Sequence, residues 1–386
     1  MLLGVVQKGH AQEVRRVDFY QGPVINSNRV VGLGGAFTGV AEGADSHLVN
    51  PAALVVRSPS TADDWFDIDG GLSFFSLDAR DQTDFDRSGR SGVFESANFA
   101  QAGFNLKFGR HGFGFHIQSH DFTLDATNLD REEDQLTYSQ NIAGLGYAYA
   151  FWEGDLVVGG MLIGGNAEMN SSDGESLLSI SGTGIQAGVL WAPCGRPFRL
   201  GASYRSEILA LAQDEESVML SEDNSVTYEM IVPSELRVGY SFMLGPRLYN
   251  VCPTFGDWEE KVGRPFPNRH LSRFYILVTL DAVLTGEVEN GTGAQAFLEN
   301  DVQPSGEHSS LSLRGGIESE VWKNRMVMRT GTYYEPNRFK ERSGRQHVTG
   351  GFDLRVFTLI WTWKLSMAID VADNYTNIGL GIGFWK

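Results

Sequence analysis

The feature that most constrains the fold is a two-residue alternation of apolar and polar side chains, which recurs from about Phe66 to the end of the chain. The stretch 97–108 shows it clearly. One face of this stretch is apolar, with Ala100, Ala102, Phe104, Leu106 and Phe108. The opposite face carries Gln101, Asn105 and Lys107. Because successive side chains of a strand point to opposite faces of a sheet, this period predicts β-strands with one apolar face.

About fourteen such segments follow one another, joined by connections that alternate between short and long, as in outer-membrane barrels. A soluble β-sandwich or propeller also alternates. The polar faces here repeatedly carry Arg, Glu and His, however, which suits a wet lumen better than a solvent-facing sheet. The sequence therefore predicts an all-β fold, a transmembrane antiparallel β-barrel over 66–386 in a bacterial outer membrane. The long outer connections are expected near 81–96, 125–135, 170–176, 213–225, 286–308 and 336–345.

The apolar residues never form a run long enough for a membrane-spanning helix, which needs about 18 of them. The net charge of −17 argues against a nucleic-acid partner, because phosphate contacts need clustered Lys and Arg.

Acidic residues gather in two of the expected outer connections. One holds Asp130, Glu132, Glu133 and Asp134, and the other holds Asp214, Glu215, Glu216, Glu222 and Asp223. Two interpretations stay open: binding of divalent cations shared with lipopolysaccharide in the surrounding lipid, or an ordinary solvated charge run.

The two cysteines are Cys194 and Cys252, and neither belongs to a C-x-x-C motif, which argues against a zinc site. Cys194 lies in a short turn on the side assigned to the periplasm. Cys252 lies in a long insertion on the same side, residues 245–270. A disulfide between them is geometrically allowed and would pin this insertion in an oxidising compartment. The insertion is also the candidate surface for a periplasmic protein partner.

The N-terminal part has a different character. Residues 1–11 resemble the end of a secretory signal peptide, with cleavage expected after Ala11. Residues 12–65 show no strand-like alternation and are rich in small residues, so we expect a compact segment inside the barrel. Its glycines lack the G-x-G-x-x-G spacing of a nucleotide-binding loop and do not follow a hydrophobic strand.

The stretch GLGGAFTGVAEGADSHLVNPAAL, residues 32–54, resembles the N-terminal signature of the FadL long-chain fatty-acid transporter superfamily. Two further stretches, RLGASYRSE (199–207) and VPSELRVGY (232–240), look like consecutive mid-barrel strands of that family.

The resemblance implies a fourteen-stranded outer-membrane barrel that is plugged by an N-terminal hatch. Hydrophobic molecules, either long-chain fatty acids or aromatic hydrocarbons, would be captured near the outer loops. They would leave after a rearrangement of the hatch or through the wall. By motif, the resemblance places in the hatch Gly34, Gly35, Ala36, Phe37, Asn50, Pro51 and Ala52. Relatives with this signature also act as scaffolds in secretion systems, so a non-transporting scaffold stays open as the alternative.

Four arginines are expected to face the lumen: Arg205, Arg237, Arg314 and Arg355. Arginine anchors carboxylates well, so one of them is a candidate ligand anchor. The other interpretation is that they pair with Glu207, Glu235, Glu318 and Asp353 and brace the hatch.

Enzyme chemistry has little support in the sequence, which contains neither G-x-S-x-G nor H-E-x-x-H. His116 and His120 share a strand face, but four residues along a strand span about 13 Å, too far for one metal ion. We therefore predict no enzymatic activity, no metal and no cofactor.

Overall fold

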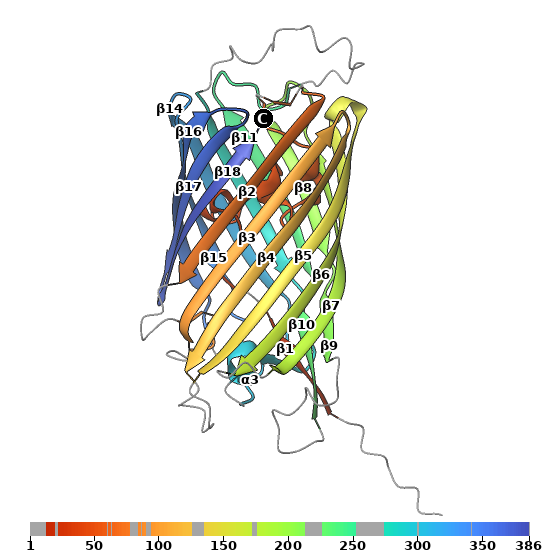
Figure 1. The fold of residues 1–386 in the computed structure, drawn as a ribbon, viewed down its shortest axis with the longest axis vertical. Helices are drawn as coiled ribbons and strands as arrows, with labels where there is room; N and C mark the ends of the chain where they lie inside the picture. Colours follow the sequence, from red (N-terminus) through yellow and green to blue (C-terminus); the bar gives the residue numbers. More distant parts are fainter. Residues whose placement is uncertain are drawn as a thin grey trace, which may run out of the picture.

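The wall of the protein is a sheet of strands that closes on itself and surrounds the N-terminal segment, as the computed structural model shows (Figure 1). The structure describes residues 13–19, 22–59, 61–62, 64–77, 84–85, 87–89, 94–125, 135–171, 176–212, 226–251, 274–298, 301–340 and 342–385.

The sheet has 18 strands, but four of them do not add a further strand to the barrel wall. β8 and β9 are two parts of one barrel strand, as are β10 and β11, while β1 and β13 lie outside the antiparallel series. Fourteen antiparallel strands of the barrel wall remain. The last of them, β18, pairs with the first, β2, and closes the barrel. The predicted all-β barrel and its strand number are confirmed.

The strands of the wall have the following bounds: β2 Phe66–Leu77, β3 Phe94–Phe108, β4 His111–Asp125, β5 Gln135–Phe151, β6 Leu156–Ser171, β7 Ser176–Trp191, β8 Phe198–Arg205, β9 Ile208–Ala212, β10 Val226–Val232, β11 Glu235–Leu244, β12 Ile276–Thr285, β14 Ser310–Trp322, β15 Met326–Glu335, β16 Arg345–Thr358, β17 Thr362–Ala372 and β18 Tyr375–Trp385.

The alternation seen in the sequence separates an apolar outer face from a polar inner face. In β4, Phe113, Phe115 and Ile117 are exposed on the outside, whereas His116 and His120 are buried inside. Most of the wall strands repeat this arrangement, with exposed side chains such as Leu145, Leu162, Leu280, Leu313 and Leu380. The apolar face therefore points away from the protein, the reverse of a soluble fold. No helix in the described ranges has the length and hydropathy needed to cross a membrane.

The two ends of the barrel differ in their connections. At the short-turn end, tight turns such as Gly109–Arg110 and 323–325 join neighbouring strands. At the other end, which we call the long-connection end, the connections between β2 and β3, β4 and β5, β9 and β10, and β12 and β14 are longer. Residues 126–134, 213–225, 299–300 and most of 78–93 in these connections are outside the described residues. The expected insertion is at the short-turn end, between β11 and β12, but its residues 252–273, Cys252 among them, are also outside the described residues.

The N-terminal segment contains one strand that the sequence did not indicate. β1, Glu13–Asp18, pairs in parallel with β10 on one side and with the short β13, Gly291–Gly293, on the other. The prediction that 12–65 holds no strand was wrong here. The sequence EVRRVD has no clear alternation, and its partners are more than 200 residues away.

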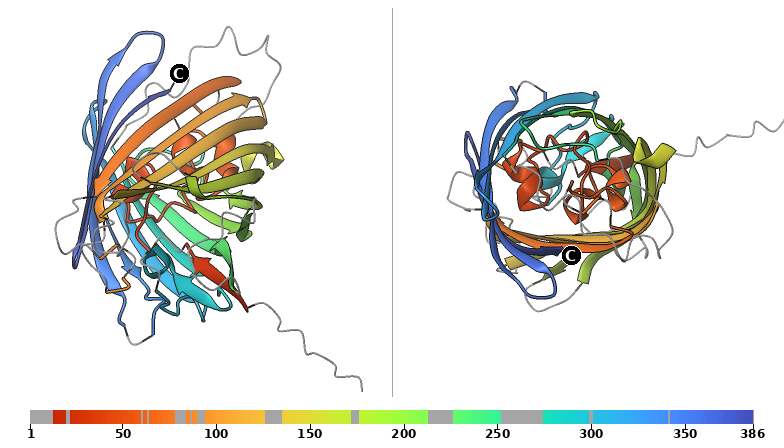
Figure 2. Two further views of the ribbon diagram at one scale, coloured as in Figure 1. Left: turned by 60° about the horizontal axis from the view of Figure 1, so that its bottom comes forward. Right: turned by 90° about the horizontal axis from the view of Figure 1, so that it is seen from above.

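After β1 the chain runs through the lumen toward the short-turn end, where β2 begins at Phe66 (Figure 2). On the way it forms the helix α1, Asn28–Gly32, and the 3-10 turns η1, Ala44–Ser46, and η2, Pro51–Leu54. Ser27 caps α1 by accepting a hydrogen bond from the Val30 N–H, and Asn50 caps η2 in the same way at Ala52.

Glycines on the inner face of the wall let the lumenal segment lie directly against the strands. A Cβ atom at Gly159 would collide with the carbonyl of Pro51, and one at Gly201 with the carbonyl of Thr38. Gly331 lies in the same way against the backbone of Gly34. The segment thus packs backbone to backbone, which only residues without a side chain permit.

This packing predicts different effects for two adjacent glycines of β6. We expect Gly159→Ala to destabilise the protein by about 1–3 kcal/mol, the usual range for overpacking. A Cβ at Gly160 instead meets nothing closer than the Gln186 carbonyl at 3.7 Å, so Gly160→Ala should be nearly neutral. Urea unfolding in detergent measures both, and equal midpoints for the two variants would contradict the close packing.

Candidate functional site

The wall satisfies the backbone polar groups of the lumenal segment. The N–H groups of Phe37 and Thr38 both donate to Asp281 Oδ2 of β12, at 2.9 and 2.8 Å. Other inward side chains donate to carbonyls of the segment, namely Gln186 to Leu48, Arg199 to Val40, Ser203 to Val49, Ser241 to Gly39 and Thr349 to Gly32. Because buried backbone groups need partners, these contacts fix the path of a segment that has little regular structure.

The residues assigned to the hatch by motif all lie on this path. Gly34 and Gly35 have φ angles of 64° and 75°, a region that favours glycine. Ala36, Phe37 and Ala52 are fully buried. The side-chain amide of Asn50 donates to the carbonyls of Thr38 and Val189, tying two parts of the segment to β7.

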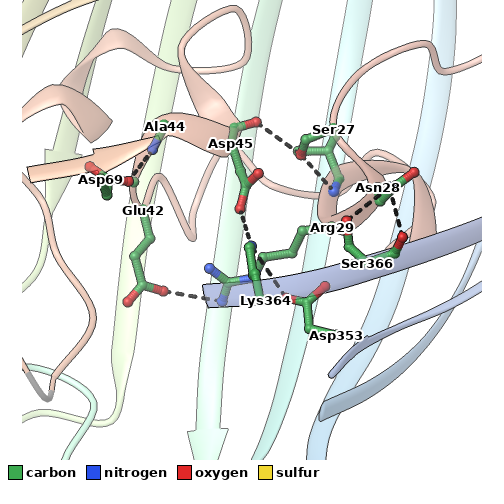
Figure 3. Close-up of polar contacts among 12 residues, drawn as sticks. Ser27, Asn28, Arg29, Glu42, Ala44, Asp45, Asp69, Asp353, Lys364 and Ser366 are labelled. Carbon is green, nitrogen blue, oxygen red and sulfur yellow. Dashed lines mark hydrogen bonds and ion pairs between the residues drawn. The ribbon is translucent and has the colours of Figure 1, made fainter. Parts of the chain in front are cut away.

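A cluster of buried charges joins α1 to the wall (Figure 3). Arg29 contacts Glu318 of β14 through two nitrogen atoms, each at 3.0 Å, and Glu42 at 3.2 Å. Burial lowers the pKa of the Arg29 guanidinium, but Glu318 and Glu42 outweigh this effect and hold it well above the usual value.

The cluster continues through three further strands. Arg329 of β15 bridges Glu318 and Asp353, at 3.0 and 2.9 Å. Lys364 of β17 then bridges Asp353 and Asp45 of the lumenal segment, at 3.3 and 3.1 Å. Within this cluster, the ion pairs Arg29–Glu318 and Lys364–Asp45 connect the segment to the wall.

A cavity of about 140 Å³ lies beside this cluster, toward the short-turn end, and we call it the turn-side cavity. Arg29, Glu42 and Asp45 line it from the segment. Arg355 lines it from the wall, with its guanidinium 5.2 Å from the Trp385 ring. Its lining combines these charged groups with apolar and aromatic side chains, among them Tyr275, Phe384 and Trp385.

A second cavity, of about 70 Å³, lies on the opposite side of α1, and we call it the loop-side cavity. Its apolar lining includes Phe19, Val24, Ile25, Val30, Leu48, Ile142 and Val232. Its polar lining includes Arg205, Arg237, Arg314 and Glu235. The charged groups of this lining are thus three guanidinium groups and one carboxylate.

The arginines of the loop-side cavity are held in position by neighbours. Glu235 pairs with Arg237 and, at 3.9 Å, with Arg205, which also donates to the Pro233 carbonyl at 3.1 Å. Arg314 Nε donates to Ser312 Oγ at 3.3 Å. Apolar walls with a few converging polar groups are the usual make-up of a small-molecule site.

Helix α1 separates the two cavities. Its Val30 side chain lines the loop-side cavity, while the adjacent Arg29 lines the turn-side cavity. The Arg29–Glu318 pair holds this five-residue helix in its place.

The structure separates the four arginines singled out in the sequence. Arg205, Arg237 and Arg314 converge on the loop-side cavity, whereas Arg355 lies in the turn-side cavity. Of the carboxylates considered as partners, Glu235 contacts two of them. Glu318 and Asp353 instead pair with Arg29, Arg329 and Lys364, none of which the sequence marked, because these contacts join strands and segment across the lumen.

Cys194 is disulfide-bonded. Its expected partner Cys252 is outside the described residues, as are residues 1–11 and the acidic clusters 130–134 and 214–223. Among the described residues, no group of three or more His, Cys, Asp or Glu is arranged to hold a metal ion.

Neither the protein-family models nor the curated proteins give a match to this chain. Solved structures, in contrast, do match this chain. A structure titled "CymD monoaromatic hydrocarbon channel" aligns with a TM-score of 0.56 at 12% identity, covering 94% of this chain and 97% of that one. A FadL homologue of Pseudomonas aeruginosa aligns with a TM-score of 0.54 at 12% identity, covering 94% and 98%. The fold is therefore that of FadL-like barrels, and the resemblance predicted from the sequence is confirmed at this level.

The cluster around Glu318 leads to a prediction about stability. Glu318→Gln removes a buried carboxylate that two arginines and the Tyr275 hydroxyl share. Breaking a buried pair costs about 3–5 kcal/mol, because charges are left uncompensated. Urea unfolding in detergent and protease cleavage within 28–54 measure the loss. The control is Glu307→Gln, whose partner Lys340 is 70% exposed, where about 0–1 kcal/mol is expected. Equal losses would contradict the bracing role.

His47 leads to a prediction about pH. Burial lowers the pKa of His47 below its ordinary 6.5, although Asp69 and the hydrogen bond to Asn105 act against this effect. The unfolded chain therefore takes up a proton as the pH falls below about 6.5 while folded His47 does not, and the folded state loses stability. We expect His47→Gln to flatten the decrease in unfolding midpoint between pH 7 and pH 5. The exposed-site variant His111→Gln should leave the decrease unchanged, and a wild-type slope in His47→Gln would refute the assignment.

Proposed function

We propose that this protein is an outer-membrane barrel that transports hydrophobic small molecules, with the N-terminal segment 12–65 acting as the hatch. The observation that carries the proposal is the pair of cavities on opposite sides of α1. A ligand would bind in the loop-side cavity and pass to the turn-side cavity when α1 moves.

The outer surface supports the membrane location. Large apolar side chains are exposed all around the wall, and burying apolar surface is favourable by about 25 cal/mol per Å². In a barrel of this kind the short turns face the periplasm and the long connections face outward. The loop-side cavity is then the outer one.

The lining of the loop-side cavity favours a hydrophobic molecule with an acidic head. Three arginines and one carboxylate leave an excess of positive charge beside an apolar lining. Arginine forms paired hydrogen bonds with carboxylates, so a fatty-acid-like ligand fits better than a neutral hydrocarbon. The similar structures include both a hydrocarbon channel and a FadL homologue by title, and so leave both classes open.

Two further predictions stay attached to this proposal. We propose that Cys194 pairs with Cys252 and that the acidic outer connections hold divalent cations shared with lipopolysaccharide. The scaffold alternative, with a periplasmic protein partner at 245–270, is an outcome of the test below.

The test is to identify and measure the ligand. We expect organic-solvent extracts of the purified barrel to contain a hydrophobic acid detectable by mass spectrometry. Calorimetry should then show dodecanoate binding that Arg314→Gln weakens about 10- to 100-fold, the effect of one hydrogen bond to a charged group. This variant keeps both ion pairs of Glu235.

The control is Arg196→Gln, an exposed arginine of a short turn, which should bind dodecanoate like the wild type. Dodecanol binding should not distinguish Arg314→Gln from the wild type. If no ligand is found, and a protein partner is retained until residues 246–269 are deleted, the transporter proposal is wrong and the scaffold replaces it.

A further inference from the structure

The chain folds back into the barrel directly after β11, at the short-turn end. β11 ends at Leu244, which is 49% exposed on the outside of the wall. Five residues later Tyr249 is only 2% exposed, and Asn250 is 4% exposed. We call residues 247–250 the clasp. Its burial inside the rim means that its polar groups must find partners there.

Ser241 of β11 connects the clasp to the hatch. Its hydroxyl donates to the Gly39 carbonyl at 2.8 Å and lies 2.7 Å from the Tyr249 hydroxyl. A serine hydroxyl carries one hydrogen, so the Tyr249 hydroxyl must be the donor in the second contact. A chain of hydrogen bonds therefore runs from Tyr249 through Ser241 to Gly39.

Arg199 of β8 makes the second connection between the clasp and the hatch. Its Nη1 donates to the Val40 carbonyl at 2.9 Å, its Nη2 to the Tyr249 carbonyl at 3.2 Å, and its Nε to Asn250 Oδ1 at 2.8 Å. The guanidinium also covers the Tyr249 ring, 3.9 Å from its centroid. Because a guanidinium is a rigid plane, the contacts with the clasp fix the orientation in which Arg199 reaches Val40.

The turn between β7 and β8 holds the clasp from the other side. The side-chain amide of Asn250 donates to the carbonyls of Pro193 and Phe198, at 3.1 and 2.8 Å. The Asn250 carbonyl accepts a hydrogen bond from the Gly195 N–H at 2.9 Å. The clasp is thus attached to the rim of the barrel on one side and to the hatch on the other.

Arg247, the first residue of the clasp, lines the turn-side cavity. Its guanidinium lies over the Tyr275 ring, 4.7 Å from the centroid. Arg29, Arg329 and Lys364 of the same lining are paired with carboxylates. Within the described ranges, in contrast, no carboxylate lies within ion-pair distance of Arg247. Arg247 is therefore available to an acidic group that enters this cavity.

We propose that the clasp keeps the hatch closed, and that Arg247 is the residue through which an acidic ligand releases it. The proposal rests on the transport function proposed above and adds its trigger. A carboxylate that binds Arg247 in the turn-side cavity draws on Tyr249, two residues further along the chain. Arg199 and Ser241 then lose the contacts that fix their positions.

The hatch residues that this release would free lie close to the cluster that holds α1. Gly39 and Val40 would keep buried carbonyls without partners, which disfavours the closed hatch. Val40 is two residues before Glu42, whose carboxylate contacts Arg29 at 3.2 Å. The clasp and the charged cluster therefore hold the same part of the hatch.

The experiment records ion conductance of the full chain in planar phosphatidylcholine bilayers, with dodecanoate as the probe. We expect dodecanoate to raise the open fraction of the wild type about tenfold, and dodecanol to have no effect. Arg247→Gln should abolish this response, and Arg247→Lys, which keeps the charge, should restore part of it. Calorimetry should show dodecanoate affinity within about threefold of the wild type in both variants, because the loop-side cavity is intact.

Variants of the clasp itself should open the hatch without a ligand. Tyr249→Phe removes the hydroxyl and keeps the ring beneath Arg199, and Asn250→Ala removes the attachment to the rim. We expect each to raise the open fraction about tenfold in the absence of dodecanoate. The matched control is Tyr147→Phe, whose hydroxyl contacts His111 at 2.8 Å on the outer surface, and which should behave like the wild type.

Hydrogen exchange separates release of the hatch from a general loss of stability. In Tyr249→Phe the amides of Val40 and Ala41 should exchange about tenfold faster than in the wild type. The amides of Ala53 and Val55, which lie in or beside η2, should exchange at the wild-type rate. Equal acceleration of both groups would overturn the proposal, since it would show a structural role only.

Two further outcomes separate this proposal from the transport function. Wild-type conductance and exchange in Tyr249→Phe and Asn250→Ala, with weaker dodecanoate binding in Arg314→Gln, would overturn the clasp and leave transport standing. A response to dodecanoate that persists in Arg247→Gln would overturn the role of Arg247. The absence of dodecanoate binding to the wild type would overturn the transport function and the trigger with it.

Discussion

The width of a fourteen-stranded barrel is the constraint on which the rest of this structure depends. About eight strands give an interior that side chains alone can fill, and wider barrels hold either water or a plug. Here the N-terminal segment occupies the lumen, and the wall is adapted to it. Glycines such as Gly159, Gly201 and Gly331 remove side chains where the segment touches the strands. Inward Ser, Thr, Gln and Arg side chains bind its carbonyls. The polar inner face is therefore better understood as a binding surface for the chain's own N-terminus than as the lining of an open pore.

Most of the wall could be predicted from the sequence because its signal is local. The period of two recurs along the wall strands. A shift of one residue in the register of a strand would turn its apolar face toward the lumen. The limits of β3, β4 and β6 follow from this pattern and from turn residues such as Gly109. β1 was missed because its sequence does not alternate and because its pairing is parallel and remote. The resemblance in residues 32–54 indicated a lumenal position for that stretch, but composition alone could not give its path.

The candidate site was predicted in part, and the reason is again geometric. Alternation correctly placed Arg205, Arg237 and Arg314 on the inner face. It could not show that β8, β11 and β14 bring them to one cavity, because that depends on the register of strands separated by tens of residues. The same limit explains why Arg355 was grouped with them although it lies in the other cavity. It also explains why Arg29 was overlooked, since its partner Glu318 lies 289 residues away.

In the transport function proposed above, the linings of the two cavities would give the passage of a ligand past α1 a direction. The loop-side cavity combines apolar side chains with three arginines and one carboxylate, so under the proposed function it suits a molecule with an apolar part and an acidic head. The turn-side cavity combines apolar and aromatic side chains with charged ones, among which Arg29, Arg329 and Lys364 are paired with carboxylates. An acidic ligand that displaces Val30 would bring its head toward Arg29 and compete with Glu318 and Glu42 for that guanidinium. Because a ligand shifts a conformational equilibrium only by the difference of its affinities for the two states, this competition is what would allow the ligand itself to loosen α1. A neutral hydrocarbon has no such means, and this distinction follows from the position of Arg29 rather than from the fold.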